Sequence, residues 1–483
     1  MDQWLGKTFD DFLFRPQKGV VESRRKISLS SGLTKSLKLE LPIVSANMDS
    51  VTGRGMAEAM ALEGGMGFIH RALPIHMQAE KVARVKRSHS AIVENPLCLP
   101  RGANIYEAIS FTRRHNITGI LIEETKGSKI LAGVLSNRDI PWMDGYGQRL
   151  VEEFMTPVER LHTSRPGISV EDAEKVLFEK RIERLPLIDE QRRIHGLITR
   201  KDILFFRRRP FSSKDAKGRL LVGAAIGARG DFLERASELI TAGVDCLLLD
   251  IAHAHSRVMQ DAIEEVRSHC RAIPLVAGNV GTAEGAQFLK ALGVDAIKVG
   301  IGPGRGCRTR LETSAGVPQL QAIREVWCAV EQTVPIIADG GIKDDKDIFL
   351  ALICGASTVM LGSALSGTDE SPGQVIEDPA SHTKKKIYRG MTSPQAVFES
   401  LYDIEDTEQV EAALQIPAEG QEIRVPYKGS VVSILQRIRG HLQSSISYAG
   451  ETTLEDARRK ILPEPLKYLI PLSEASRRES YER

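Results

Sequence analysis

The chain has 483 residues, a length typical of about two to four domains. Its 65 basic and 63 acidic residues leave a net charge of +2, so no global field favours nucleic acid or an anionic membrane. Six cysteines without a CxxC pair indicate reduced thiols and no structural zinc, and no apolar run approaches the ~20 residues of a membrane helix. The acidic N-terminal segment does not resemble a signal peptide, so we expect a cytoplasmic protein.

The segment before residue 94 carries a strand, helix, strand pattern. The apolar runs LPIVSANM, from Leu41 to Met48, and GGMGFIHR, from Gly64 to Arg71, have the length of buried strands. Between them, residues 53–64 place methionine and alanine on one face of a helix with glycine at both ends. Two buried strands joined by a helix predict a parallel sheet.

Residues 94–205 contain an internal repeat. Residues 104–122 match the segment that begins at residue 169, and residues 133–140 match residues 196–203. The doublet resembles a tandem CBS pair, which implies a regulatory domain that binds ATP or GTP. The resemblance places Asp139 and Asp202 on ribose hydroxyls, with Thr199 and Arg200 at hydroxyl and phosphate contacts. The alternative is that both aspartates only cap helices.

Six further apolar runs follow residue 206, separated by helical patterns. They begin at Leu220, Cys246, Pro274, Ala296, Pro335 and Thr358. With the two earlier strands they make eight parallel units, which predicts an α/β fold, a (β/α)8 TIM barrel formed by residues 1–93 and 206–483. An open doubly wound sheet is the rival, but no GxGxxG fingerprint follows the first strand.

The strand that ends at Val299 leads into a loop with four glycines, and Cys307 lies in that loop between two arginines. Glycine lets backbone approach an anion closely, and cationic neighbours favour the thiolate form of cysteine. The pattern therefore predicts a nucleophilic cysteine. The alternative is a small buried structural thiol, which the surrounding glycines and arginines argue against.

Polar residues at the other strand ends predict a binding site at that end of the barrel. Gly341 follows the seventh strand, and Gly362 and Ser363 follow the eighth, where a phosphate commonly rests on backbone N–H groups. Asp339 is an acceptor suited to a ribose diol. We therefore expect a nucleoside monophosphate with its base toward Cys307.

An ordered set of motifs resembles the IMP dehydrogenase and GMP reductase family. The motifs are SANMDSVTG, AGNVGTAEGA, VGIGPGxxCxTR, GVPQL, IADGGI, MLGSALSGTDESPG, YRGM and AEGQEIRVPYKG. The resemblance implies that Cys307 attacks C2 of a purine nucleotide and that a nicotinamide cofactor exchanges a hydride at this carbon. It also implies a homo-oligomer, a tetramer or an octamer. By position it assigns the nucleotide to Asp339, Gly341, Gly362, Ser363, Tyr388, Gly390 and Met391, the cofactor to Asp250 and Asn279, and a monovalent cation such as K+ to the carbonyls of Gly300, Gly302 and Cys307.

The segment from Gly390 to Glu422 bears on which reaction is catalysed. Dehydrogenases of this family hydrolyse the covalent intermediate with a flap whose Arg-Tyr pair activates water. This segment contains no arginine and no lysine, and Leu401 precedes Tyr402 where that arginine is expected. Reductases instead use a threonine and glutamate pair to protonate the departing ammonia. Thr309 and Glu419 match that pair by position.

We therefore predict an NADPH-dependent GMP reductase. The alternative is an IMP dehydrogenase that uses NAD, which the motif LLLDIAHAHS and the CBS insert favour. A catalytically silent nucleotide sensor is a third hypothesis. Two residues depart from the family pattern: Arg305 replaces a serine that contacts phosphate, and Arg308 replaces a threonine or isoleucine. Arginine holds phosphate through paired N–H groups, so we expect Arg305 to contact the substrate, and Arg308 is a candidate contact for NADPH.

Overall fold

The structure is a computed structural model that describes residues 2–88, 92–115, 117–140, 145–377, 379, 381–400, 415 and 417–481. The chain forms two compact units. The first unit comprises Met1–Ser88, Phe211–Asp215 and Leu220–Arg483, and the second comprises His89–Pro210 and Ala216–Arg219. In the part of the chain that the structure describes, no helix is both long enough and apolar enough to cross a membrane.

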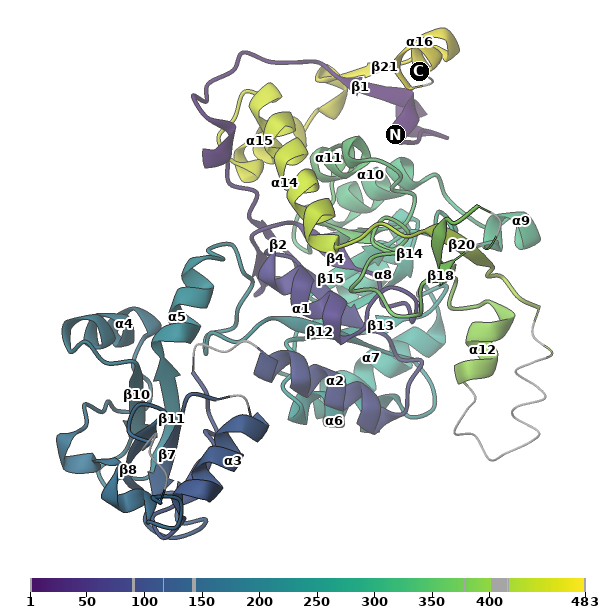
Figure 1. Ribbon diagram of the computed structural model, residues 1–483. Coiled ribbons are helices and arrows are strands. Elements are labelled where there is room, and N and C mark those ends of the chain that lie inside the picture. Colours follow the sequence, from purple (N-terminus) through teal and green to yellow (C-terminus); the bar gives the residue numbers. More distant parts are fainter. Residues whose placement is uncertain are drawn as a thin grey trace. The chain divides into compact units, whose positions relative to one another are not determined.

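Eight parallel strands close into a barrel in the first unit (Figure 1). The ring closes because β17 pairs with β4 in parallel register, Val359 opposite Ile43. Each strand lies within a run that the sequence predicts, so the TIM barrel is confirmed and the open-sheet alternative is wrong. The strands are β4 (Ile43–Ser45), β5 (Met66–Ile69), β12 (Val222–Ile226), β13 (Cys246–Asp250), β14 (Leu275–Val280), β15 (Ala296–Val299), β16 (Ile336–Asp339) and β17 (Thr358–Leu361).

Helices connect the strands and cover the outside of the ring. The local sequence starts and stops them: Thr282 caps α8 by accepting from the Gly285 N–H at 3.2 Å, and Gly293, with φ of 75°, follows the helix. The helices around the barrel are α1 (Arg54–Leu62), α2 (Ile75–Ser88), α6 (Phe232–Thr241), α7 (Arg257–His269), α8 (Ala283–Ala291), α10 (Gln319–Val330), α11 (Asp345–Cys354) and α14 (Val431–Tyr448).

Two apolar layers hold the barrel together. Inside the ring, Val44, Phe68 and Met360 pack in one buried cluster. Outside it, strand residues such as Ile43 pack with buried side chains of the helices, including Leu435 of α14. Burial on both faces explains why these strands read as continuous apolar runs, and it leaves their polar carboxyl ends to form a site.

A small antiparallel sheet follows the barrel. It consists of β18 (Ile376–Glu377), β19 (Lys384–Arg389) and β20 (Glu422–Pro426), and Tyr388 of β19 pairs with Ile423 of β20. This pairing holds two stretches of the predicted site, around residues 390 and 420, next to each other. The remaining elements of this unit are β1 (Phe12–Phe14), which pairs with β21 (Leu469–Pro471) beside both termini in Figure 1, β2 (Ser31–Gly32), β3 (Lys38–Leu39), α9 (Thr309–Thr313), α12 (Pro394–Ser400), α15 (Leu454–Ile461) and α16 (Glu474–Tyr481).

The second unit follows the sequence repeat. Each copy supplies one helix and two antiparallel strands, and the strands pair as β7 with β8 and as β10 with β11. A helix that begins at Arg200 follows the second copy, whereas residues 137–140 form a turn and bend after the first. The elements are β6 (Cys98–Pro100), α3 (Ile105–His115), β7 (Gly119–Glu123), β8 (Leu131–Ser136), β9 (Thr156–Pro157), α4 (Val170–Glu179), β10 (Arg184–Ile188), β11 (Ile194–Thr199) and α5 (Arg200–Arg207).

Candidate active site

A cavity of about 2280 Å³ opens at the carboxyl ends of the barrel strands. A drug-sized ligand usually occupies about 300 to 1,000 Å³, so this cavity has room for two ligands side by side. The structure brings nearly all the predicted barrel site residues together there. The cavity is lined by Asp250, Asn279, Gly300, Gly302, Arg305, Cys307, Thr309, Asp339, Gly341, Gly362, Ser363, Tyr388, Gly390, Met391 and Glu419.

Backbone hydrogen bonds connect three separate segments around Cys307: the cysteine loop, residue 390 and residues 419–421. The Arg308 N–H donates to the Glu419 carbonyl at 2.7 Å, and the Gln421 N–H donates to the Gly306 carbonyl at 3.0 Å. The Gly390 N–H donates to the Gln421 carbonyl at 3.0 Å. A side chain at residue 306 would place its Cβ 2.9 Å from the Gly390 nitrogen, so this approach requires glycine.

The side chains of Cys307, Thr309 and Glu419 form a hydrogen-bonded chain. The Thr309 hydroxyl donates to Glu419 Oε2 at 2.6 Å, and the Cys307 thiol donates to Thr309 Oγ1 at 3.1 Å. A hydroxyl both donates and accepts, so Thr309 connects the thiol to the carboxylate. The arrangement places a nucleophile and an acid–base group within one proton-transfer path.

A buried lysine, Lys298, joins the two aspartates of the site. Its ammonium lies 2.8 Å from Asp250 Oδ1 and 2.6 Å from Asp339 Oδ2, and its side chain is only 3% exposed. Burial alone would lower the pKa of Lys298, but the two carboxylates outweigh burial and raise it. Asn47 and Asn279 complete the network by donating to Asp250 Oδ2 at 2.7 Å and to Asp339 Oδ2 at 3.0 Å.

The same contacts lower the pKa of Asp250, one of the two acidic partners of Lys298. Burial raises the pKa of Asp250, yet the charge of Lys298 and the hydrogen bonds from Lys298 and Asn47 overcome it and leave the pKa below its ordinary value. Asp250 is therefore a fixed anion at the cavity wall. The sequence prediction missed Lys298, which lies inside an apolar run; a lysine within a fully buried strand was the available signal.

The predicted phosphate residues converge at the ends of β16 and β17. Gly341 adopts φ of 78°, a left-handed value that favours glycine. A Cβ at residue 362 would lie 3.1 Å from the Tyr388 hydroxyl, so the tyrosine approaches this glycine closely. Burial, with the charge of Asp339, raises the pKa of Tyr388 to about 12, so its hydroxyl remains a donor at neutral pH.

The loop carbonyls predicted to hold a monovalent cation already have protein partners nearby. The Asn279 amide donates to the Gly300 carbonyl at 2.7 Å, and the Arg310 guanidinium donates to the Ile301 carbonyl at 3.2 Å. A cation bound by Gly300, Gly302 and Cys307 would share this loop with the positive charge of Arg310. The K+ site stays a prediction, and we derive no chemical step through it.

Two other predictions concern Arg308 and the pair Leu401 and Tyr402. Arg308 pairs with Glu312 of α9 at 2.7 Å and does not line the cavity, so the structure gives no support for an NADPH contact there. The predicted difference at Leu401 and Tyr402 lies outside the described residues.

The predicted nucleotide residues of the second unit make contacts within their own chain segments. Thr199 caps α5: its hydroxyl accepts from the Asp202 N–H at 3.2 Å and donates to Asp202 Oδ2 at 2.5 Å. Asp139 accepts from both the N–H and the hydroxyl of Ser136 at 2.8 Å. Arg200 is the first residue of α5. Asp202 is the third residue of α5, whose cap is Thr199, and Asp139 lies in a turn, so neither aspartate is itself a helix cap among the described residues. The ATP or GTP role stays a prediction.

Comparison with known proteins identifies the class of protein that this barrel and cysteine site define. The model of the "IMP dehydrogenase / GMP reductase domain" matches residues 6–482. The chain therefore belongs to the IMP dehydrogenase and GMP reductase family, whose members are oxidoreductases of purine metabolism that use a nicotinamide cofactor.

Some of the similar proteins are named IMP dehydrogenase and others GMP reductase. The chain is 42% identical over 456 residues to inosine-5'-monophosphate dehydrogenase of Nitrosopumilus maritimus, covering 93% of each chain. It is 41% identical over 456 residues to the Bacillus subtilis dehydrogenase, covering 94% of this chain and 91% of that protein. Among solved structures, GMP reductase from Trypanosoma brucei in complex with guanosine 5'-monophosphate superposes with a TM-score of 0.85 at 34% identity, covering 98% of this chain and 97% of that chain.

Proposed function

We propose that this protein is a GMP reductase, which converts GMP and NADPH to IMP, ammonia and NADP. The observation that carries the proposal is the composition of residues 390–422, which contain no arginine and no lysine. Hydrolysis of a cysteine-linked purine requires a water molecule to be activated, and the family's dehydrogenases use a flap arginine for this. Because this segment has no cationic side chain to activate water, we expect the intermediate to be reduced by hydride and not hydrolysed.

The proposed reaction begins at Cys307. Its sulfur forms a bond to C2 of GMP, the thiol proton passes along Thr309 and Glu419, and ammonia leaves as the C2–N bond breaks. The hydroxyl of Thr309 contacts both groups at 3.1 and 2.6 Å, which supports this proton path. A bound nicotinamide cofactor supplies the hydride that C2 accepts. The C2–S bond then breaks with its electron pair on sulfur, IMP is released, and the Cys307 thiolate takes up a proton from solvent to restore the thiol.

The residues of the cavity fit a second ligand beside the nucleotide. The volume exceeds what one nucleotide requires, and Asp250 and Asn279 are among the residues that line the cavity. The buried Oδ1 of Asn279 has no hydrogen-bond partner among the described residues. A carboxylate and an amide acceptor suit the hydroxyl and carboxamide groups of a nicotinamide nucleotide.

IMP dehydrogenase is the second candidate function. Relatives that are 41–43% identical and cover 93–94% of this chain carry that name. The cysteine loop and the glutamate at position 419 suit either enzyme. If the protein is an IMP dehydrogenase, it activates water without an arginine in the flap. The oligomer and the ligands of the CBS pair stay predictions from the family resemblance.

Two parallel incubations test the proposal. The protein is mixed with GMP and NADPH, and separately with IMP and NAD, while absorbance follows the nicotinamide cofactor. We expect NADPH consumption and ammonia release only in the first mixture, and no activity of Cys307→Ala in either. Turnover only in the second mixture would establish the dehydrogenase instead. No turnover in either, with nucleotide binding intact, would favour the silent sensor.

A further inference from the structure

An ion pair holds the end of β19 against the loop that follows β4. Arg389, the last residue of β19, donates through Nε and a terminal nitrogen to Oδ2 of Asp49, at 2.8 and 2.5 Å. The two side chains are only 13% and 10% exposed. Ser50 adds a backbone contact, because the Arg389 N–H donates to its Oγ at 3.2 Å. The loop after β4 is thereby joined to a residue 340 positions later in the chain.

Asp49 and Arg389 are not among the described residues that line the cavity, but their neighbours in the sequence are. Met48 precedes Asp49, and Gly390 follows Arg389. The hydroxyl of Tyr388, which also lines the cavity, lies 3.8 Å from Met48 Sδ. The ion pair therefore joins two stretches of the cavity wall. We expect it to affect the reaction through the position of this wall and not through contact with a ligand.

A series of backbone contacts leads from the ion pair to the candidate acid–base group. One residue after Arg389, the Gly390 N–H donates to the Gln421 carbonyl at 3.0 Å. The Gln421 N–H donates in turn to the Gly306 carbonyl at 3.0 Å. Glu419 lies two residues before Gln421, so its backbone is aligned by the same contacts that begin at the ion pair.

The three segments in this series are packed backbone against backbone. A Cβ at residue 420 would lie 2.5 Å from the Ser393 nitrogen, and a Cβ at residue 390 would clash with the Gly306 carbonyl oxygen. Both positions therefore require glycine. Close packing of this kind transmits strain, so a shift at the end of β19 must displace the segment around residue 420.

We propose that Asp49 and Arg389 are positioning residues: their ion pair holds the segment 419–421 against the cysteine loop, and with it the Glu419 carboxylate at the Thr309 hydroxyl. The inference rests on the acid–base role proposed for Glu419, and it applies to either direction of the reaction. Neither residue of the pair takes part in the chemistry. Their effect reaches the nucleophile through the backbone at the end of β19.

The geometry of the pair favours a positioning role over a stabilising one. Asp49 Oδ1 is buried and has no hydrogen-bond partner among the described residues. An unpaired buried oxygen costs stability, and a buried ion pair often gives little net stabilisation. An arginine that donates two hydrogen bonds does, however, fix the direction of its partner. The pair between Asp49 and Arg389 therefore suits the alignment of two backbone segments.

Hydrogen–deuterium exchange, measured by mass spectrometry on the full-length protein, tests the positioning role without turnover. Exchange of the Gly390 and Gln421 amides reports how often the hydrogen bonds of these segments open. In Asp49→Asn we expect both amides to exchange about 10- to 100-fold faster than in wild type, the usual effect of losing a charged hydrogen bond. Peptides that cover β12 should exchange at the wild-type rate, which shows that the barrel is intact.

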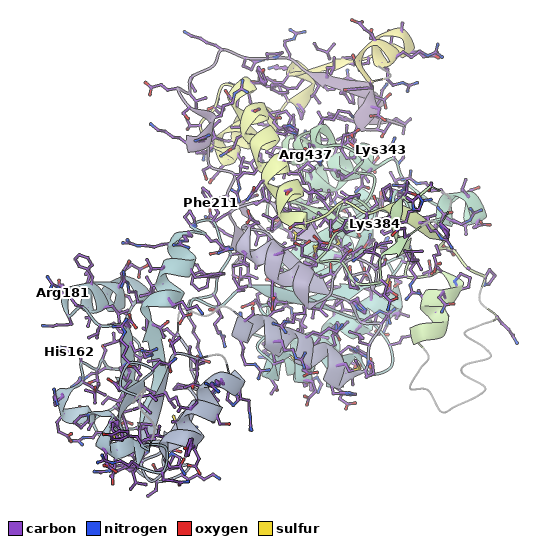
Figure 2. The ribbon with its side chains drawn as sticks, in the orientation of Figure 1. His162, Arg181, Phe211, Lys343, Lys384 and Arg437 are labelled. Atoms are coloured by element: carbon purple, nitrogen blue, oxygen red, sulfur yellow. The ribbon has the colours of Figure 1, made fainter. Side chains whose placement is uncertain are left out.

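Two further variants make the exchange result specific. Asp345→Asn is the matched control: Asp345 is 14% exposed, pairs with Arg437 of α14 at 3.0 Å (Figure 2) and lies outside the cavity lining. It should leave the exchange of both amides unchanged. Arg389→Lys keeps a cation beside Asp49 and loses the paired N–H groups, so it should show the same acceleration in weaker form even if Asp49→Asn does not fold.

A double-mutant cycle on kcat connects the position of the segment to the chemistry. The assay uses whichever nucleotide and cofactor the protein turns over. In wild type we expect Glu419→Gln to lower kcat about 10²- to 10⁴-fold. Asp49→Asn lowers kcat by itself, and in this background Glu419→Gln should reduce kcat by a factor about ten times smaller, because the carboxylate is no longer held at Thr309.

Two results would overturn the positioning role. One is exchange of the Gly390 and Gln421 amides in Asp49→Asn that is no faster than in Asp345→Asn. The other is an equal loss of kcat from Glu419→Gln in wild type and in Asp49→Asn. Failure of the proposed acid–base role looks different: Glu419→Gln then leaves the kcat of wild type unchanged, and the exchange rates still decide whether the ion pair holds the segment.

Discussion

The hydroxyl of Thr309 lies 2.6 Å from the carboxylate of Glu419, a residue 110 positions later in the chain. The contact exists because the segment around Gly420 pairs with the cysteine loop through backbone hydrogen bonds on both sides of Cys307. The backbone pairing therefore places the Glu419 carboxylate where two hydrogen bonds, through Thr309, connect it to Cys307. This relationship links the thiol to an acid–base group before any substrate binds.

Replacing Glu419 tests the acid–base role. Glu419→Gln keeps the shape of the side chain and removes its ability to transfer a proton, so we expect kcat for GMP reduction to fall about 10²- to 10⁴-fold with little change in KM. Glu422→Gln, three residues away and exposed at the start of β20, is the matched control. Equal kcat values for the two variants would show that Glu419 takes no part in proton transfer.

Thr309 and Glu419 should act as one unit. Thr309→Val removes the hydroxyl between the thiol and the carboxylate, and adding it to Glu419→Gln should reduce kcat little further. The measurement is a double-mutant cycle on kcat. Full additivity of the two effects would contradict a shared proton path.

Replacing Cys307 separates chemistry from binding. Cys307→Ala should lose measurable turnover and still bind GMP, because the residues predicted to hold the phosphate and ribose lie elsewhere in the cavity lining. Mass spectrometry of the acid-quenched wild-type protein with GMP should show a covalent adduct that the variant lacks. The exposed Cys328 provides the control, since Cys328→Ala should keep both adduct and turnover. Turnover by Cys307→Ala would exclude the covalent route.

The buried ion pair network of Lys298 should dominate the stability of the site. Lys298→Met leaves Asp250 and Asp339 without their cation, and removing one partner of a buried pair typically costs about 3–5 kcal/mol of unfolding free energy. The lowered pKa of Asp250 means that its contribution is present above about pH 4 and is lost as pH falls through the folded pKa. The raised pKa of Lys298 keeps the contribution present below about pH 10 and lost at still higher pH.

Urea denaturation of wild type and Lys298→Met measures this difference. We expect it to be constant between about pH 5 and pH 9 and to shrink outside that range. A difference below about 1 kcal/mol at pH 7 would show that the pair gives no net stabilisation.

His70 should make the protein sensitive to acid. Burial lowers the pKa of His70 to about 3, with Lys81 and Arg389 adding repulsion, so the folded protein holds it neutral. The unfolded chain binds a proton below about pH 6.5, and stability is therefore lost at up to about 1.4 kcal/mol per pH unit as pH falls from there. His70→Asn should remove this dependence of the unfolding free energy on pH. The control is His162→Asn, at an exposed residue of the other unit (Figure 2), which should retain it. Equal slopes for wild type and His70→Asn would contradict the assignment.

The sequence predicted the barrel because each strand is an apolar run that ends in glycine or a polar residue. Strands buried on both faces have few alternatives, and the glycines and caps set where each helix starts and stops. The candidate nucleophile Cys307 was also visible, because its loop concentrates glycine and arginine. The order of family motifs then indicated the other predicted site residues that line the cavity.

Lys298 escaped the sequence prediction because it is a polar residue inside a buried strand, and its two carboxylate partners come from other strands. The aspartates of the repeat show the reverse problem, since Asp139 and Asp202 each accept a hydrogen bond from a residue three positions earlier in the chain.

Transfer of deuterium to C2 of the purine distinguishes reduction of GMP from oxidation of IMP. Wild-type protein is incubated with GMP and with NADPH that carries deuterium at both C4 positions of the nicotinamide. For a GMP reductase we expect IMP one mass unit heavier than normal and an equal amount of ammonia. Failure to form deuterated IMP, together with production of XMP from IMP and NAD, would contradict it.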